Sequence, residues 1–295
     1  WPMFHHDLTH TGCSESPAPN TNQTQWNYTT GGYVGSSPAV VDGRVYVGSR
    51  DGRVYCLDAY TGAHSWNYTT GGYVGSSPAV VDDRVYVGSG DGRVYCLNAS
   101  NGEHVWNYTA GGSSSPAVVD GKVYVGSGDG KVYCLDAHTG ASVWNCTTSG
   151  HVFSSPAVVD GKVYVGSSDG KVYCLDALTG ALVWNHTTGA EVHSSPAVAD
   201  GKVYVGSYDH RVYCLNASSG ELVWSYLTDE RVWSSPAIAD GMVFIGSGDN
   251  SVYAFGNIVR AEDYMTIQEA INASTPGATI IIALGMYNES LAINK

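Results

Sequence analysis

The chain has 295 residues, enough for one large all-β domain or for two smaller domains. Its 14 lysines and arginines stand against 27 aspartates and glutamates, and the resulting net charge of -13 disfavours nucleic acid and anionic lipid headgroups as partners. The sequence contains no run of about 18 apolar residues, so we expect no membrane-spanning helix.

The N-terminal segment, residues 1–25, ends in a connector rich in Pro, Asn and Thr. Its three histidines are His5, His6 and His10. They are candidate metal ligands, although packing of this segment under a larger fold is the alternative that we favour. The stretch 25–30 is then predicted to be a β-strand that carries Trp26 but has no strands of its own before it.

The chain next repeats one unit, which is clearest in residues 154–184. Three short apolar runs, 156–159, 162–166 and 171–175, are separated by Asp-Gly pairs, and a fourth run ends on Trp184. Asp-Gly between alternating apolar runs is the strongest short hairpin signal, because the turn needs positive φ at both central residues. Each unit is therefore predicted to be a four-stranded antiparallel meander.

The repeat places a tryptophan every 40 residues, apart from one interval of 38 residues. The positions are Trp26, Trp66, Trp106, Trp144, Trp184 and Trp224. A period near 40 residues with four strands per unit is typical of propeller blades.

The first and last parts of the repeat are incomplete in opposite ways. The last unit, with strands expected at 236–239, 242–246 and 251–255, lacks the Trp-bearing fourth strand, whereas the N-terminal strand lacks the other three. We therefore predict an all-β, six-bladed propeller that the N-terminal strand closes. Seven blades are the alternative if residues 1–12 supply further strands.

The corner before each tryptophan carries one motif, seen as Cys-Leu-Asp-Ala-Leu-Thr-Gly-Ala-Leu-Val-Trp at 174–184. It resembles the tryptophan-docking motif of the pyrroloquinoline-quinone-type (PQQ-like) propeller family, with Cys in place of the leading Ala. The opening residues 1–4 and Thr11-Gly12 also resemble the N-terminal segment of that family. The resemblance covers residues 1 to about 256 and implies that each tryptophan docks between its own blade and the next, which is a structural role.

The repeat stops after Gly256, which divides the chain into a propeller at 1–256 and a C-terminal extension at 257–295. Residues 264–273 show helical spacing of apolar side chains, and strands are expected at 279–283 and 290–293. The extension resembles the start of a pectin-lyase-like right-handed β-helix, in which a short helix caps the first coil. One coil cannot bury a solenoid core, so the propeller, a partner chain or a further part of the protein must cover it.

Five of the seven cysteines occupy the same place in successive repeats. They are Cys56, Cys96, Cys134, Cys174 and Cys214. Equivalent positions in neighbouring blades lie beyond the reach of a disulfide, which needs Cα atoms within about 7 Å, so we interpret them as small buried hydrophobic residues. Cys13 and Cys146 lie outside this series and could pair, although nothing in the sequence brings them together.

Glycosylation sequons, the acidic charge and a composition rich in Gly, Ser, Thr, Asn and Tyr favour a secreted protein. The candidate asparagines are Asn22, Asn27, Asn67, Asn98, Asn107, Asn145, Asn185, Asn216, Asn272 and Asn288. Several of them are copies of one repeated motif and are not independent observations. The chain also begins at Trp1, which favours a mature product whose signal peptide has been removed.

Residues that vary between otherwise similar repeats are the candidate ligand-binding residues. We expect the connections between blades and the turns between the second and third strands to gather on one face around the central channel. The varying residues that offer charge, hydrogen bonds and aromatic faces there are His151, Glu191, His193, Tyr208, Arg231 and Trp233. Drift of solvated loop residues is the alternative explanation.

Catalytic signatures are weak in this sequence. Glu191 and His193 offer an acid and a base, but no nucleophile or oxyanion signature accompanies them. The aspartates of the Asp-Gly turns, such as Asp169, recur because the turns need them. Quinone-dependent dehydrogenases of the resembled family carry a vicinal Cys-Cys pair and a calcium site beside the cofactor, and this chain has no Cys-Cys dipeptide.

We therefore expect no catalytic residues, no cofactor and no metal site. The expected function is that of a secreted or cell-surface propeller that serves as a binding or assembly module. Its partners would be other surface proteins or copies of itself, joined through the C-terminal extension. The alternative is a cofactor-dependent oxidoreductase of the quinoprotein type that uses the mouth of the channel.

Overall fold

Six antiparallel sheets follow one another in chain order, as the repeat predicts. The structure, a computed structural model, describes Phe4, Asp7, His10 and residues 20–112, 114–256, 258–260, 266–274 and 279–281. The sheets have the strand orders β1-β2-β3-β4, β5-β6-β7-β8, β9-β10-β11-β12, β13-β14-β15-β16, β17-β18-β19-β20 and β21-β22-β23. We call each sheet a blade and number the blades in this order.

The first strand of each blade is β1 (Ala39–Val41), β5 (Ala79–Val81), β9 (Ala117–Val119), β13 (Ala157–Val159), β17 (Ala197–Ala199) and β21 (Ala237–Ala239). The second is β2 (Arg44–Ser49), β6 (Arg84–Ser89), β10 (Lys122–Gly126), β14 (Lys162–Ser167), β18 (Lys202–Ser207) and β22 (Met242–Gly246). The third is β3 (Arg53–Asp58), β7 (Arg93–Asn98), β11 (Lys131–Asp136), β15 (Lys171–Asp176), β19 (Arg211–Asn216) and β23 (Val252–Gly256). The fourth is β4 (His64–Thr69), β8 (His104–Thr109), β12 (Ser142–Thr147), β16 (Leu182–Thr187) and β20 (Leu222–Leu227).

The two kinds of Asp-Gly turn differ in their backbone. In the turn between the first and second strands both residues have positive φ, 49° at Asp160 and 68° at Gly161. In the turn between the second and third strands only the glycine does, as at Gly170 with φ 80°. Asp169 keeps a negative φ there and accepts a hydrogen bond at Oδ1 from the N–H of Lys171 at 3.1 Å, which is an Asx-type turn.

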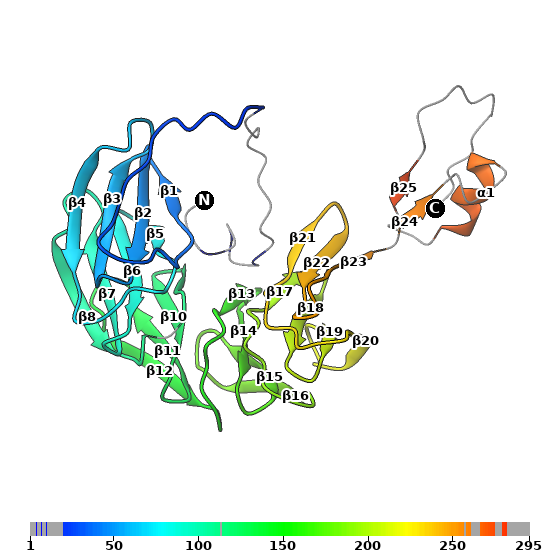
Figure 1. Cartoon of the computed structure of the whole chain (residues 1–295). Helices are drawn as coiled ribbons and strands as arrows, with labels where there is room; N and C mark the ends of the chain where they lie inside the picture. Colours follow the sequence, from blue (N-terminus) through cyan, green and yellow to red (C-terminus); the bar gives the residue numbers. More distant parts are fainter. Residues whose placement is uncertain are drawn as a thin grey trace.

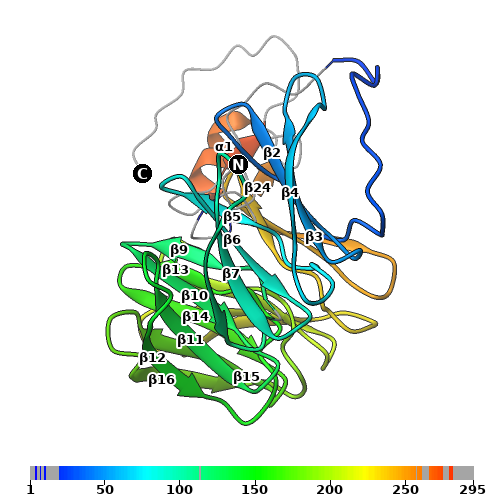
Figure 2. The same cartoon turned by 90° about the vertical axis from the view of Figure 1, so that its left-hand side faces the viewer.

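The blades lie side by side around an arc, with the short first strands on its inside and the fourth strands on its outside (Figure 1). Neighbouring blades stack face against face (Figure 2). The apolar core lies in these interfaces. Val54 of blade 1 and Val80 of blade 2, for example, belong to one buried cluster, and the same cluster recurs between blades 2 and 3, 3 and 4, and 4 and 5.

The tryptophans hydrogen-bond to the following blade. The indole N–H of Trp66 donates to the carbonyl oxygen of Ala99 at 2.9 Å, and Trp26, Trp106, Trp144 and Trp184 make the equivalent bond at 3.0 Å. Each ring lies against a glycine of the next corner, where it leaves no room for a Cβ atom. These contacts support the docking role that the family resemblance implies.

The expected closure by the N-terminal strand is not confirmed. Residues 25–30 form no strand, and β23 has no fourth strand beside it among the described residues. Trp26 nevertheless docks on blade 1, since its indole N–H reaches Ala59 O. Blades 1 and 6 lie at the two ends of the arc (Figure 1), so the residues that would pair to close the ring are apart.

The five repeated cysteines are buried and free, which confirms their interpretation as small core residues. Burial raises the pKa of the thiols of Cys96, Cys134, Cys174 and Cys214 to about 11, so these cysteines stay protonated at neutral pH. Cys146 is also free, so the structure gives no support to the pairing with Cys13 that the sequence left open; Cys13 itself lies outside the described residues.

His10 packs inside the fold, which is the alternative that we favoured over metal binding. Its ring is 2% exposed, and Nδ1 donates to the carbonyl oxygen of Pro196 at 3.0 Å. The His10 and Phe4 rings also pack at nearly a right angle, with ring centroids 5.4 Å apart. His5 and His6 lie outside the described residues.

The C-terminal extension contains β24 (Ile258–Arg260), α1 (Ile267–Ala273) and β25 (Thr279–Ile281). Thr266 caps α1 by accepting a hydrogen bond from the N–H of Glu269, and the expected face of Ile267, Ala270 and Ile271 is buried. β24 pairs with β25 in parallel. In the described part of the chain no helix is long and apolar enough to cross a membrane.

Two glycines allow the effect of the tryptophan contact on stability to be measured apart from the effect of backbone strain. Gly180 and Gly161 have similar φ values of 73° and 68°, but a Cβ atom would lie 2.6 Å from the Trp144 ring at Gly180 and would meet nothing within 4 Å at Gly161. We expect Gly161→Ala to cost about 1 kcal/mol from left-handed strain alone and Gly180→Ala to cost about 1–3 kcal/mol more from overpacking. Urea denaturation measures both, and equal midpoints would contradict the role of the ring contact.

Candidate functional site

Two kinds of loop meet at one edge of the blades. In blades 1, 2, 4, 5 and 6, the loop that leads into the first strand accepts a backbone hydrogen bond from the turn between the second and third strands of the same blade. The N–H of Ser168 donates to His151 O at 2.8 Å, that of Tyr208 to Glu191 O at 2.9 Å, and that of Gly248 to Arg231 O at 2.9 Å. The sequence placed these loops on one face, and the backbone contacts join them directly.

The six candidate residues come together at this edge. Ring centroids are 5.3 Å apart for His151 and Phe153, 5.2 Å for Phe153 and His193, 4.6 Å for His193 and Tyr208, and 6.3 Å for Tyr208 and Trp233. The guanidinium of Arg231 lies 5.3 Å from the centre of the Tyr208 ring. We call this row the aromatic ridge, comprising His151, Phe153, His193, Tyr208, Arg231 and Trp233.

His193 is the polar centre of the ridge. Its Nε2 lies 3.0 Å from Glu191 Oε2 and 3.0 Å from Ser168 Oγ. Because an ionised carboxylate only accepts hydrogen bonds, Nε2 carries the proton in the neutral ring. Burial lowers the pKa of His193, the nearby charge of His151 lowers it further, and Glu191 opposes both. The side chain is therefore neutral at pH 7, and the ridge presents one carboxylate and one guanidinium at its margins.

Sequence reasoning left out two members of this site and a second group. Phe153 bridges His151 and His193, and Ser168 contacts His193. In blade 1, the Arg50 guanidinium lies 5.4 Å from the Tyr33 ring centre and 5.9 Å from that of Tyr73. All of these residues occupy loop positions homologous to those of the ridge, and that shared position was the signal that could have identified them.

Glycines make room for the aromatic rings. A Cβ atom at Gly90 would lie 2.3 Å from the Tyr73 ring, and one at Gly248 would lie 3.1 Å from the Trp233 ring. Each of these rings therefore lies against a glycine in the turn between the second and third strands, where a side chain would clash with it. Phe153 and Trp233 remain 42% and 55% exposed, so their faces are available to a partner.

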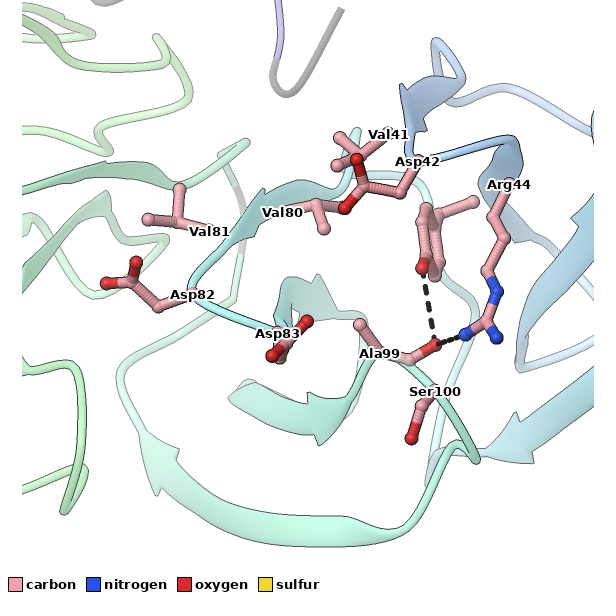
Figure 3. A pocket seen from close by; sticks show the side chains of 10 residues that line it. Val41, Asp42, Arg44, Val80, Val81, Asp82, Asp83, Ala99 and Ser100 are labelled. Carbon is pink, nitrogen blue, oxygen red and sulfur yellow. Dashed lines mark hydrogen bonds between the residues drawn. The ribbon is translucent and has the colours of Figure 1, made fainter.

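A separate pocket of about 430 Å³ lies at the opposite edge, between blades 1 and 2 (Figure 3). Its walls include the carboxylates of Asp42, Asp82 and Asp83. Arg44 Nη1 and Tyr46 Oη both donate to Ala99 O, at 3.0 and 3.2 Å, which is also the acceptor of the Trp66 indole. The pocket is thus built from the joint between two blades, and the ridge is the better candidate for a functional surface.

The side chains of the ridge are of types suited to binding a partner. Glu191 and His193 form an acid and base pair, and the hydroxyl beside them is that of Ser168. Because His193 Nε2 carries its proton toward Glu191, it is not placed to accept the proton of Ser168 Oγ. In the part of the chain that the structure describes, no three His, Cys, Asp or Glu residues are grouped to hold a metal ion. Exposed aromatic faces beside an arginine are instead the residue types that dominate binding energy in protein interfaces.

The pKa of His193 tests the electrostatics of the ridge. We expect the ring to titrate below its ordinary value of 6.5, Glu191→Gln to lower that pKa further, and His151→Gln to raise it. Because the folded-state pKa is depressed, the associated stability is present above the ordinary value and is lost as the pH falls through the folded-state pKa. NMR titration of the ring protons measures each shift, and a pKa above the ordinary value in the wild type would contradict this account.

Solved structures with the same fold span different functions. The chain is similar to BamB from Moraxella catarrhalis (22% identity, 78% of this chain and 87% of that chain covered, TM-score 0.53). It is also similar to the computationally designed Ika8 protein (20% identity, 76% of this chain and 70% of that chain covered, TM-score 0.68). A third similar structure is quinohemoprotein alcohol dehydrogenase from Comamonas testosteroni (17% identity, 84% of this chain and 57% of that chain covered, TM-score 0.71). These identities show the fold alone. A search of the curated proteins gave no significant match.

A protein-family comparison is more specific. Residues 16–116, 109–192 and 168–259 match the PQQ-repeat family described as outer membrane protein assembly factor BamB. The matched segments cover all six blades and support the resemblance to PQQ-like propellers that the corner motif indicates. Since they cover well over half of the sequence, the chain belongs to this family of PQQ-repeat, BamB-type proteins.

Proposed function

We propose that the chain is a secreted or cell-surface, non-catalytic propeller that binds a partner protein through the aromatic ridge. The observation that carries the proposal is the continuous row of rings from His151 to Trp233, half of it exposed, on loops that the blades hold rigidly. The family description names an assembly factor, which supports protein binding as the activity. The acidic net charge of -13 favours partners with basic surfaces.

The quinoprotein alternative has the support of one structural neighbour, an alcohol dehydrogenase. The donor set here does not fit such a cofactor. The sequence has no adjacent cysteines, and no metal-binding group is found among the described residues. The only acid and base pair at the ridge, Glu191 with His193, serves to fix the orientation of the histidine ring.

We propose the same division of the chain as the sequence indicates, a propeller at 1–256 and an extension at 257–295. The parallel pairing of β24 with β25 and the packing of α1 on Ile280 support a first coil of a parallel β-helix. Self-assembly through this extension stays a prediction, because its second expected strand, 290–293, lies outside the described residues.

Localisation outside the cell is testable from two classes of sequon. Asn145 and Asn185 lie exposed in fourth strands. Asn98 and Asn216 lie half-buried at corners, and their Oδ1 atoms accept hydrogen bonds from the sequon serines Ser100 and Ser218. The strand asparagines are therefore accessible to a glycosylating enzyme, whereas the corner asparagines are held inside a turn.

On protein purified from its natural source we expect glycans at Asn145 and Asn185 and none at Asn98 and Asn216. Peptide mass spectrometry measures occupancy at all four sites in one digest, so the corner sites serve as internal controls. Unmodified asparagines at both strand sites would contradict the secreted or cell-surface location.

The ridge itself is tested by site-specific cross-linking. A benzoylphenylalanine at Phe153 should capture a partner in the source cells, and the same probe at Leu178, an exposed corner residue at the other edge of the blades, should not. With the partner purified, Trp233→Ala should weaken binding on the order of 30-fold, or about 2 kcal/mol, and Leu178→Ala should leave it unchanged. Equal capture from both positions, or full affinity in Trp233→Ala, would contradict the proposal.

A further inference from the structure

The two ends of the arc expose residues that every other blade buries. Val252 on blade 6 is 77% exposed. Its five counterparts are all 0% exposed, and they are Val54, Val94, Val132, Val172 and Val212. At the other end, Val45 on blade 1 is half-buried, whereas its counterparts Val85, Val123, Val163 and Val203 are 0% exposed. Each end therefore carries apolar surface that burial would stabilise.

These two surfaces are the halves of one repeated interface. Val54 of blade 1 and Val85 of blade 2 lie in the same buried cluster. Val252 corresponds to Val54 and Val45 corresponds to Val85, so the free face of blade 6 matches the free face of blade 1. An interface between unlike surfaces is heterologous, and it joins subunits head to tail.

A series of hydrogen bonds, which we call the serine belt, joins one serine of each blade to a serine of the next blade and ends at blades 1 and 6. The N–H of Ser37 donates to Ser77 Oγ at 2.9 Å, and the chain of donors continues through Ser77, Ser115 and Ser155 to Ser195, whose N–H donates to Ser235 Oγ at 3.0 Å. Among the described residues the belt stops there. A sixth link would run from the N–H of Ser235 to Ser37 Oγ.

The missing fourth strand of blade 6 is present elsewhere in the chain. Residues 26–30, Trp-Asn-Tyr-Thr-Thr, are identical to residues 66–70, which include most of β4. This segment already sits on blade 1 as a preceding fourth strand would. Trp26 donates to Ala59 O, and the N–H of Gly31 donates to Asp51 Oδ2 at 2.8 Å, as Gly71 does to Asp91 at 3.0 Å. By analogy with β3 and β4, Trp26 would pair with Ala254 and Tyr28 with Val252.

We propose that this segment completes blade 6 of a second copy of the chain, so that arcs join head to tail through strand addition. The five existing interfaces, each with its apolar cluster and serine bond, fix the arc and hold its ends apart (Figure 1). Closure within one chain would change the rotation at every interface, whereas a second copy meets the free end without such a change. Main-chain pairing to the edge of β23 supplies affinity, and the Trp26 joint supplies register. This contact does not involve the aromatic ridge, so its test does not depend on the proposed function of the ridge.

Disulfide trapping at the sixth serine link tests the proposal. In a background with Cys13→Ser and Cys146→Ser, equimolar Ser37→Cys and Ser235→Cys chains are mixed and oxidised. Neighbouring serines of the belt are within hydrogen-bond distance, which suits a disulfide. We expect a reducible dimer that contains both variants. The control mixture pairs Ser37→Cys with Ser195→Cys, whose serine already lies inside a buried link, and should stay monomeric.

The chain that carries both Ser37→Cys and Ser235→Cys shows whether blade 6 binds the N-terminal segment of its own chain or that of a second copy. A ladder of disulfide-linked multiples is the expected result. A monomer with an internal disulfide would overturn the proposal in favour of ring closure within the chain, and the absence of any mixed dimer would overturn it as well.

A second measurement does not depend on cysteines. Replacing Asn27 and Tyr28 together by proline removes two consecutive N–H groups, one of which must face β23 in the proposed ladder. We expect sedimentation velocity across a concentration series to show at least tenfold weaker self-association than in the wild type, with no loss of folding because residues 25–30 form no strand within their own chain. Prolines at Asn22 and Gln23, upstream of the pairing, are the matched control. Equal association of all three proteins would overturn the proposal.

Discussion

The structure depends on one hydrogen bond repeated around the arc, from an indole N–H of one blade to an alanine carbonyl of the next. Ala99 O accepts from Trp66, Tyr46 and Arg44, all of which belong to the preceding blade. A buried carbonyl without partners costs about 1–3 kcal/mol, so these donors from one blade favour the joint with the next. The glycine beside it is equally necessary, because the Trp66 ring occupies the space that a Cβ atom at Gly102 would need.

This joint explains why chemistry is confined to the loops at one edge. The buried positions of the strands are used by packing between blades, whereas the loops before the first strands are held by backbone bonds such as that from Tyr208 N to Glu191 O. A backbone bond does not depend on the side chain, so residues 151, 191, 193, 208, 231 and 233 can differ between blades at little structural cost. The ridge arises where three such variable loops, those before β13, β17 and β21, follow one another.

Strands, turns and the gathering of the loops follow from local pattern, and for that reason the sequence predicts them well. Asp-Gly pairs define the hairpins, and the period defines the blades. The open arc does not follow from local pattern, because it depends on the rotation between blades, which the packing of whole side chains at the tryptophan joint determines. Phe153 was missed for a related reason. An apolar loop residue carries no chemical signal in sequence, and only its position between His151 and His193 shows its role.

Repetition also governs the ends of the arc. In a repeat array, stability is close to a sum of unit and interface contributions, and blade 6 has one interface only. That interface buries a cluster of three residues, Val212, Val232 and Ile245, where each of the other four clusters buries twelve. The free face of blade 6 cannot distinguish the N-terminal segment of its own chain from that of another copy. Within one chain the effective concentration of that segment would be far higher, so self-closure would prevail wherever geometry allowed it. An arc whose joints hold its ends apart loses that advantage, and the contact then passes to a neighbouring molecule.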